Sequence, residues 1–319
     1  MARQLATTRG MAERLVTGGL PTVSVIIPVR DGAQGLALCL AALTRQTYPR
    51  ELIEVVVVDN ASTEDLAPAL PPDPRFAMIH EGALGSYAAR NAGIARATGA
   101  ILAFTDGDCI PEPGWISAGV EALRADPRPD AVGGRIHLTF PAGRPTNGPQ
   151  HYEDVFGFPQ RRYIEKLSFS ATANLLAWRE TFDRVGLFDA DLRSGGDVNW
   201  GRRLVAGGGT LRYRADAVVG HPARATWGEL RRKTIRVAQG LADQRTDSDR
   251  AARRVRHDVL HEVRTATSIW WRVWSLPRPT GARAKVQFAA TTSHVRLLRA
   301  RLRLQDSNRA RATRQNERT

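Results

Sequence analysis

Two aspartates separated by one glycine, Asp106 and Asp108, follow the largely apolar segment 99–105. If that segment is a strand, both carboxylates lie at a sheet edge, and open α/β sheets bind ligands at the carboxyl ends of their strands. Carboxylate oxygens are the hard ligands that Mg²⁺ and Mn²⁺ prefer, and these ions bind diphosphates. The triplet alone is a weak signal, because acidic pairs are also common in surface turns.

Two further charged residues are expected near these aspartates. Asp59 ends the run 53–58, which is apolar on both faces, as a buried parallel strand is. Arg90 lies one turn into a predicted helix over 86–97, where it could pair with phosphate oxygens. Each also has an ordinary structural explanation, since Asp59 could be a turn residue and Arg90 could form an ion pair on the helix surface.

The elements that must position these residues alternate between strands and helices. Strands are predicted over 23–29, 53–58, 76–79, 101–105, 131–136 and 171–177, and helices over 36–43, 86–97, 115–123, 179–185 and 197–206. Because short connections join the early elements, the first ~135 residues predict a doubly wound α/β sheet. Residues 140–165 are rich in proline, glycine and aromatics, and predict a long loop.

The net charge of +14 is concentrated in the last third of the 319-residue chain. Residues 222–319 carry 23 Lys and Arg against 8 Asp and Glu, so the preceding part is close to neutral. This asymmetry predicts a near-neutral body with a basic appendage for an anionic surface. Two cysteines cannot build a disulfide framework, which favours a cytoplasmic protein. Residues 1–20 predict a flexible leader without the apolar core of a secretory signal.

Seven segments in order resemble a known family. They are VSVIIPVRD at 23–31, VVVDNAS at 56–62, AARNAGIA at 88–95, FTDGD at 104–108, ATANLLAWR at 171–179, VGLFD at 185–189 and GGDVNWGRRL at 195–204. This ordered set resembles a family 2 glycosyltransferase, inverting and metal-dependent, with the GT-A fold, over roughly residues 21–240. The resemblance implies an α/β fold: a mixed, mostly parallel sheet with helices on both faces, followed by a basic helical C-terminal region.

The resemblance also implies a domain organisation. A catalytic domain spans 21–222, with a nucleotide half over 21–135 and an acceptor half over 136–222. Residues 223–305 are then the basic helical region, and the polar composition of 306–319 predicts a disordered tail.

The resemblance implies where a sugar donor binds. Its nucleotide lies in the crevice after the first strand, at Pro28, Val29, Arg30 and Asp31. Asp59 accepts a hydrogen bond from the base, typically uracil, and Arg90 lies by the nucleotide or its diphosphate. Asp106 holds the ribose or a metal-bound water, and Asp108 binds the metal, Mn²⁺ or Mg²⁺. The metal neutralises the departing nucleoside diphosphate.

An inverting transfer also needs a base that deprotonates the acceptor hydroxyl. The resemblance assigns this role to Asp197 and places Arg203 at the arginine that usually follows, where we expect it to contact the sugar or acceptor. The chain departs from the family pattern at Gly196, where a first acid is common. Asp197 could also be the N-cap of its helix, and the two roles are compatible.

Three more residues are candidates by position. His221 lies where many relatives carry a third metal or diphosphate ligand, although a lone histidine is more often structural. Trp178 and Trp200 are candidates for a sugar or acceptor platform, with core packing as the alternative.

The basic region combines tryptophans and arginines on predicted amphipathic helices, as in the segment 269–274. Such helices suit a membrane interface with anionic lipid. The alternatives are packing on the body or a homodimer interface. Nucleic acid is not expected as a partner, because no recognition motif accompanies the arginines.

The sequence therefore predicts a glycosyltransferase of the hexosyltransferase type that moves a sugar from a nucleotide-sugar, a UDP-sugar, to a glycan or lipid-linked acceptor. We expect it in polysaccharide or glycolipid biosynthesis, in the cytoplasm, peripheral at the inner face of the plasma membrane. One alternative is a nucleotidyltransferase. Such an enzyme usually has a glycine-rich basic loop after the first strand, and residues 30–33 do not form that loop. The other is a catalytically silent, membrane-associated binding protein, against which the four aspartates together argue.

Overall fold

The computed structural model describes residues 16–17, 19–243 and 249–316, and the chain divides into two compact units. The first unit comprises the chain up to His137 together with residues 158–192 and 196–222. The second unit comprises residues 138–157 and 193–195 and the chain from Ala223 onward. Most of the predicted leader lies outside the described residues. At its end, β1 (Val16–Thr17) pairs with β2 (Leu20–Pro21).

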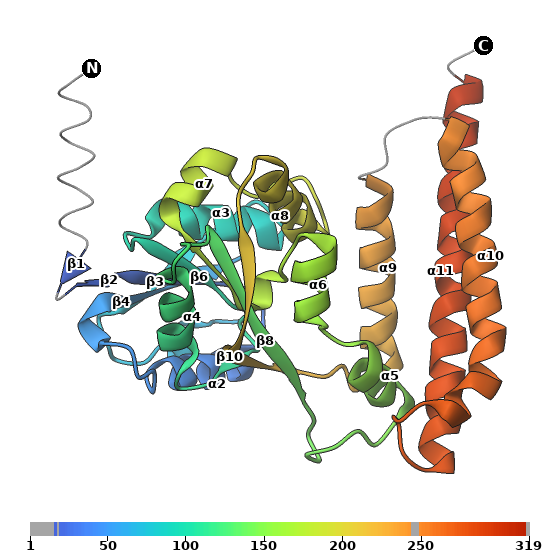
Figure 1. Ribbon diagram of the computed structural model, residues 1–319, viewed down its shortest axis with the longest axis horizontal. Coiled ribbons are helices and arrows are strands. Elements are labelled where there is room, and N and C mark those ends of the chain that lie inside the picture. The colour runs from blue at the N-terminus through green and yellow to red at the C-terminus, as the bar shows by residue number, and fades with distance from the viewer. Residues whose placement is uncertain (1–15, 18, 244–248, 317–319) are drawn as a thin grey trace. The chain divides into compact units, whose positions relative to one another are not determined.

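The first unit is built on an eight-stranded sheet with the order β5-β4-β3-β6-β9-β8-β10-β7 (Figure 1). Its strands are β3 (Val23–Val29), β4 (Ile53–Asp59), β5 (Phe76–His80), β6 (Ile101–Phe104), β7 (Ile110–Pro111), β8 (Ala131–Thr139), β9 (Leu175–Trp178) and β10 (Leu211–Pro222). The four strands β5, β4, β3 and β6 are parallel, and β9 runs antiparallel to β6 and β8. The sheet is therefore mixed, and parallel in the half that the sequence predicts as doubly wound.

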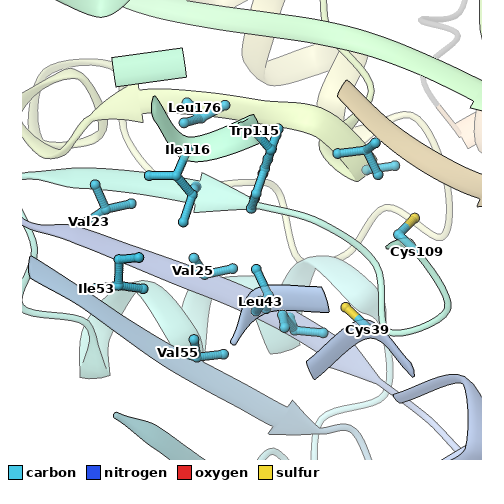
Figure 2. Packing of buried hydrophobic residues seen from close by; sticks show 14 of the residues in the cluster. Val23, Val25, Cys39, Leu43, Ile53, Val55, Cys109, Trp115, Ile116 and Leu176 are labelled. Atoms are coloured by element: carbon cyan, nitrogen blue, oxygen red, sulfur yellow. The ribbon is translucent and has the colours of Figure 1, made fainter. Parts of the chain in front are cut away.

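Helices cover both faces of this sheet because successive residues of a buried strand point to opposite sides. Val25 and Val55 face α2 (Ala33–Leu43) and α4 (Trp115–Leu123) in the larger apolar cluster. Figure 2 shows this packing, with Trp115 and Ile116 over the strands. Ile26 faces the other way, toward α3 (Ser86–Arg96), α7 (Arg179–Val185) and α8 (Gly196–Ala206).

One glycine brings α3 unusually close to the sheet. A Cβ at Gly93 would lie 2.5 Å from Cγ2 of Ile26 and 3.1 Å from Cγ2 of Val58. A side chain here would push the helix off the strands. Gly93 thus fixes the height of α3, whose first turns carry two residues of the candidate site.

The segment 140–165, predicted as a long loop, instead contains α5 (Gly148–Phe156) and the start of α6 (Gln160–Leu167). Asn147 caps α5, since its Oδ1 accepts a hydrogen bond from the backbone N–H of Gln150 at 3.1 Å. Tyr152 packs with Leu230 and Val295, which are distant in sequence. This tertiary packing stabilises a short helix with poor local propensity, and composition alone cannot reveal it.

The second unit contains α9 (Trp227–Asp243) and a hairpin of α10 (Asp249–Arg272) and α11 (Ala282–Asn316), joined through the 3₁₀ turn η4 (Val273–Ser275) (Figure 1). Buried Glu262 on α10 accepts from Arg296 at 2.9 Å and lies 3.2 Å from Arg303. Helix α11 runs on to Asn316, where the sequence predicts a disordered tail from 306. Among the described helices, none offers an apolar stretch sufficient to cross a bilayer.

Candidate active site

Three carboxylates that follow two predicted strands, those of Asp59, Asp106 and Asp108, lie at one edge of the sheet. Val29 of β3 pairs with Asp59 at the end of β4, and β3 also pairs in parallel with β6, which ends two residues before Asp106. The turn that follows β6 crosses β3 closely, because a Cβ at Gly107 would lie 3.2 Å from the Cβ of Val29. Parallel pairing thus gathers the carboxyl ends of β3, β4 and β6, with Pro28 and Val29 among them.

Four side chains at this edge form a group that could hold a metal ion. One ligand atom each from Asp106, Asp108, Cys109 and His221 lies within 4.8 Å of the others. Burial raises the pKa of the Cys109 thiol well above its usual value, which disfavours the thiolate form that a metal ligand needs. The two carboxylates and the imidazole remain, and this oxygen-rich donor set suits Mn²⁺ or Mg²⁺.

The orientation of the His221 ring supports a ligand role. Its Nδ1 lies 2.9 Å from the carbonyl oxygen of Pro222. A carbonyl only accepts hydrogen bonds, so Nδ1 carries the proton and Nε2 keeps its lone pair in the neutral ring. Phe158 packs on the ring at a centroid distance of 4.6 Å. Such a fixed tautomer is typical of metal-binding histidines.

Arg90 reaches the same group from α3. The side chain is buried, and Nη2 donates to Asp106 Oδ1 at 2.5 Å while Nη1 donates to the carbonyl of Ser86 at 3.1 Å. Its Nε is also buried and has no hydrogen-bond partner within the described part of the chain. A buried N–H without an acceptor is costly, so an anionic ligand at this edge would stabilise the guanidinium.

The predicted nucleotide residues Asp31 and Asp59 are held in the turns after β3 and β4. Asp59 accepts from the N–H of Ser62 at 2.9 Å and lies 3.0 Å from Nδ1 of His80. Burial raises the pKa of Asp59, but these hydrogen bonds outweigh burial and leave the pKa below its usual value. Asp31 accepts from Thr63 at 2.7 and 3.0 Å, and Arg30 beside it is exposed.

Asp197 lies in the first turn of α8, beside a residue that sequence analysis missed. The hydroxyl of Tyr87 donates to Asp197 Oδ1 at 3.2 Å, and the N–H of Val198 donates to the same oxygen at 2.9 Å. Burial nevertheless raises the pKa of Asp197. Because α8 begins at Gly196, Asp197 is a helical residue and does not act as the N-cap.

Gly196 leaves the room that Tyr87 occupies. A Cβ at Gly196 would lie 2.8 Å from three atoms of the Tyr87 ring. Tyr87 also stands three residues before Arg90, whose guanidinium carbon lies 5.6 Å from the centre of the ring. The helical spacing to Arg90 is the only signal in the sequence that pointed to Tyr87.

The three residues predicted to contact the sugar or acceptor are not gathered with the aspartates. Trp200 is 1% exposed and stacks on Phe182 at 4.5 Å, because α8 turns this side chain into the core. Trp178 pairs with Ile101 at the amino end of β6, the opposite edge of the sheet from Asp106. Arg203 donates to the carbonyls of residues 185 and 187 at 2.5 Å each, and so anchors the backbone before α8.

Comparison with known proteins identifies relatives of one kind. Residues 24–186 match the sequence profile of glycosyl transferase family 2. The chain is 37% identical over 269 residues to glycosyltransferase AglE of Haloferax volcanii, covering 83% of this chain and 84% of that protein. It is 29% identical over 212 residues to the pre-mycofactocin glycosyltransferase of Mycobacterium tuberculosis, covering 63% of this chain and 43% of that protein.

Two solved structures share the fold. The mannosyltransferase PcManGT from Pyrobaculum calidifontis, in complex with GDP-Man and Mn²⁺, superposes with a TM-score of 0.57 and 21% identity, covering 96% of this chain and 83% of that one. GalNAc-T7 with UDP, GalNAc and Mn²⁺ superposes with a TM-score of 0.51 and 20% identity, covering 65% and 45%. At this identity the likeness establishes the fold and leaves the substrates open.

The mixed sheet, whose fold these two structures share, defines a GT-A transferase fold, and Asp106 and Asp108 at its carboxyl edge could hold a metal ion. The chain belongs to glycosyl transferase family 2 and is a glycosyltransferase. The predicted family, fold and enzyme class are confirmed, and the nucleotidyltransferase and the silent binding protein are set aside. The roles of the individual site residues stay predictions.

Proposed function

We propose that this protein is an inverting, divalent-metal-dependent glycosyltransferase that transfers a sugar from a UDP-sugar to a hydroxyl of a glycan or lipid-linked acceptor. One observation carries the proposal. A metal-type donor set and a separate half-buried carboxylate, Asp197, are linked through Arg90 and Tyr87 on one helix. That arrangement supplies both a place for a leaving diphosphate and a base.

The donor side of the proposal rests on residues at the strand ends. Asp108, Asp106 and His221 would hold Mn²⁺ or Mg²⁺, and such an ion would stabilise the charge that develops on the leaving nucleoside diphosphate. The Mn²⁺ in both related structures supports this ion. Arg90 binds a phosphate oxygen, and Asp59, ionised and able only to accept, binds the N3–H of uracil.

The acceptor side rests on Asp197. As the acceptor oxygen forms its bond to the anomeric carbon, the bond from that carbon to the diphosphate oxygen breaks, and the hydroxyl proton moves to Asp197. Attack from the face opposite the leaving group inverts the anomeric centre. Burial raises the pKa of Asp197, which favours proton uptake by this carboxylate. We place the reaction in the cytoplasm at the inner face of the plasma membrane.

The test is transfer by the purified protein with a panel of nucleotide-sugars and Mn²⁺. Asp197→Asn should keep nucleotide binding and lose about 10²–10⁴-fold in transfer rate, the usual contribution of a general base. Asp183→Asn, an exposed carboxylate on α7, is the matched control and should keep full activity. Full activity of Asp197→Asn would refute the assignment of Asp197 as the base. A product that retains the donor's anomeric configuration would refute the inverting mechanism.

A further inference from the structure

The end of α10 and the turn that follows it expose three tryptophans that the hairpin does not need for its own packing. Trp270, Trp271 and Trp274 are 45%, 65% and 55% exposed. The core at this end of the hairpin is instead formed around Val273 and Phe288, which are 1% and 0% exposed. Figure 1 shows this turn at the end of the hairpin away from the chain's C-terminus. We call residues 270–286 the hairpin tip.

The hairpin tip carries positive charge without acidic neighbours along the chain. Residues 263–305 contain nine Lys and Arg and no Asp or Glu. Arg272 and Arg283 are exposed within the tip, and Arg278 is exposed as well, 3.8 Å from Asp154. Lys285 has a local structural role, because its Nζ donates to the carbonyl oxygen of Trp274 at 2.9 Å. The arginines therefore add a positive field around the exposed indoles.

The arrangement of the indoles favours a lipid bilayer over a folded protein as the partner. Neighbouring residues on a helix differ by about 100° in direction, so Trp270 and Trp271 point to different sides of α10. The indoles of Trp270 and Trp271 therefore do not form one flat face for a protein partner. A bilayer interface accepts them from every side, because an indole combines an apolar ring with one N–H donor.

We propose that the hairpin tip docks this protein on an anionic membrane surface, with the indoles at the level of the lipid headgroups. The exposed arginines then lie against the lipid phosphates, to which their planar donor groups are suited. Each basic side chain near such a surface strengthens binding about fivefold. The inference is independent of the proposed donor and base, since every residue it uses lies in the second unit.

The test is flotation of the full-length protein with vesicles of phosphatidylcholine containing phosphatidylglycerol, and with vesicles of phosphatidylcholine alone. The protein should float with the anionic vesicles and lose at least about tenfold in binding in Trp271→Ser/Trp274→Ser. Trp227→Ser is the matched control, because Trp227 on α9 is also 45% exposed but lies outside the tip. Arg272→Gln/Arg283→Gln should weaken flotation with anionic vesicles at low salt more than at high salt.

Circular dichroism and donor hydrolysis without vesicles are measured for every variant, so that a misfolded variant is recognised and replaced by Trp271→Ala alone. Equal flotation of the tip variant and the native protein would overturn the proposal. Equal binding of the native protein to neutral and anionic vesicles would also overturn it. So would a native protein that binds neither vesicle and is a dimer where the tip variant is a monomer. The two proposals can fail separately. Loss of transfer in Asp197→Asn with normal flotation tests the proposed reaction alone, and loss of flotation in the tip variant with normal donor hydrolysis tests the membrane proposal alone.

Discussion

The hydrogen bond from Tyr87 to Asp197 offers a sharp test of how the base is tuned. Tyr87→Phe keeps the ring against Gly196 and removes the hydroxyl that donates to Oδ1 at 3.2 Å. A hydrogen bond to a charged group contributes about 1.5–3 kcal/mol, and we take ~1 kcal/mol for this long one. Its loss disfavours the ionised carboxylate and moves the pKa of Asp197, already raised by burial, further upward.

The sign of the effect on catalysis follows from the role of Asp197. A base must be ionised to accept a proton, so kcat/KM falls as the pH drops below the pKa of Asp197. A higher pKa in Tyr87→Phe moves this acid limb to higher pH. On the limb itself kcat/KM should fall about fivefold, the equivalent of ~1 kcal/mol, while the plateau at higher pH changes little.

The assay is the pH profile of kcat/KM for sugar transfer with saturating Mn²⁺. Tyr48→Phe is the matched control, because it also loses a buried hydrogen bond, from its hydroxyl to the carbonyl of Pro21 at 2.5 Å, away from the site. The control should lower stability and leave the acid limb in place. An unmoved acid limb in Tyr87→Phe, or one that moves to lower pH, would refute the link between the hydroxyl and the base.

Three further predictions concern the metal, acid stability and the placing of α3. Asp108→Ala should abolish Mn²⁺-dependent donor hydrolysis, measured with an excess of metal. Glu153→Gln should lower the free energy of unfolding by about 1.5–3 kcal/mol in urea, because it leaves half-buried Lys233 without its carboxylate at 2.8 Å. Burial raises the pKa of Glu153, but its cationic partners outweigh burial and hold the pKa below its usual value. The stability that Glu153 contributes is therefore present above its pKa in the unfolded chain and is lost as the pH falls through its pKa in the folded protein. The variant should lack this pH dependence. Gly93→Ala should lower the free energy of unfolding by about 1–3 kcal/mol and reduce activity, because the added Cβ contacts Ile26. Adding Ile26→Ala to this variant should restore part of its activity.

The sequence predicted the nucleotide half well because its signals are local. The strands β3, β4 and β6 are buried on both faces and therefore appear as short apolar runs. Each is followed at once by polar turn residues, so the position of Asp59 or Asp106 at a strand end follows from the sequence itself. Parallel pairing then brings the ends together without further information.

The acceptor side was harder to predict because its residues are placed by tertiary packing. Trp200 has the composition of a sugar platform, yet α8 packs it against Phe182 in the core. Helix α5 has a proline near its start and is stabilised by contacts with α9 and α11. Whether an aromatic residue on a helix packs in the core or contacts a ligand depends on which face of the helix is buried. The sequence of a short helix has too few apolar positions to predict that face well.

The contacts along α3 connect the two sides of the proposed reaction. Arg90 holds Asp106 on the donor side, the ring of Tyr87 lies against the Arg90 guanidinium, and the Tyr87 hydroxyl reaches Asp197 on the base side. All of these groups depend on the height of one helix, which Gly93 sets. A displacement of α3 therefore perturbs Asp106 and Asp197 together. Gly196 belongs to the same arrangement, because the acid that is common in the family at that position would need the space of the Tyr87 ring. In this chain Tyr87, from α3, thus occupies the space beside Asp197 that a side chain at position 196 would need.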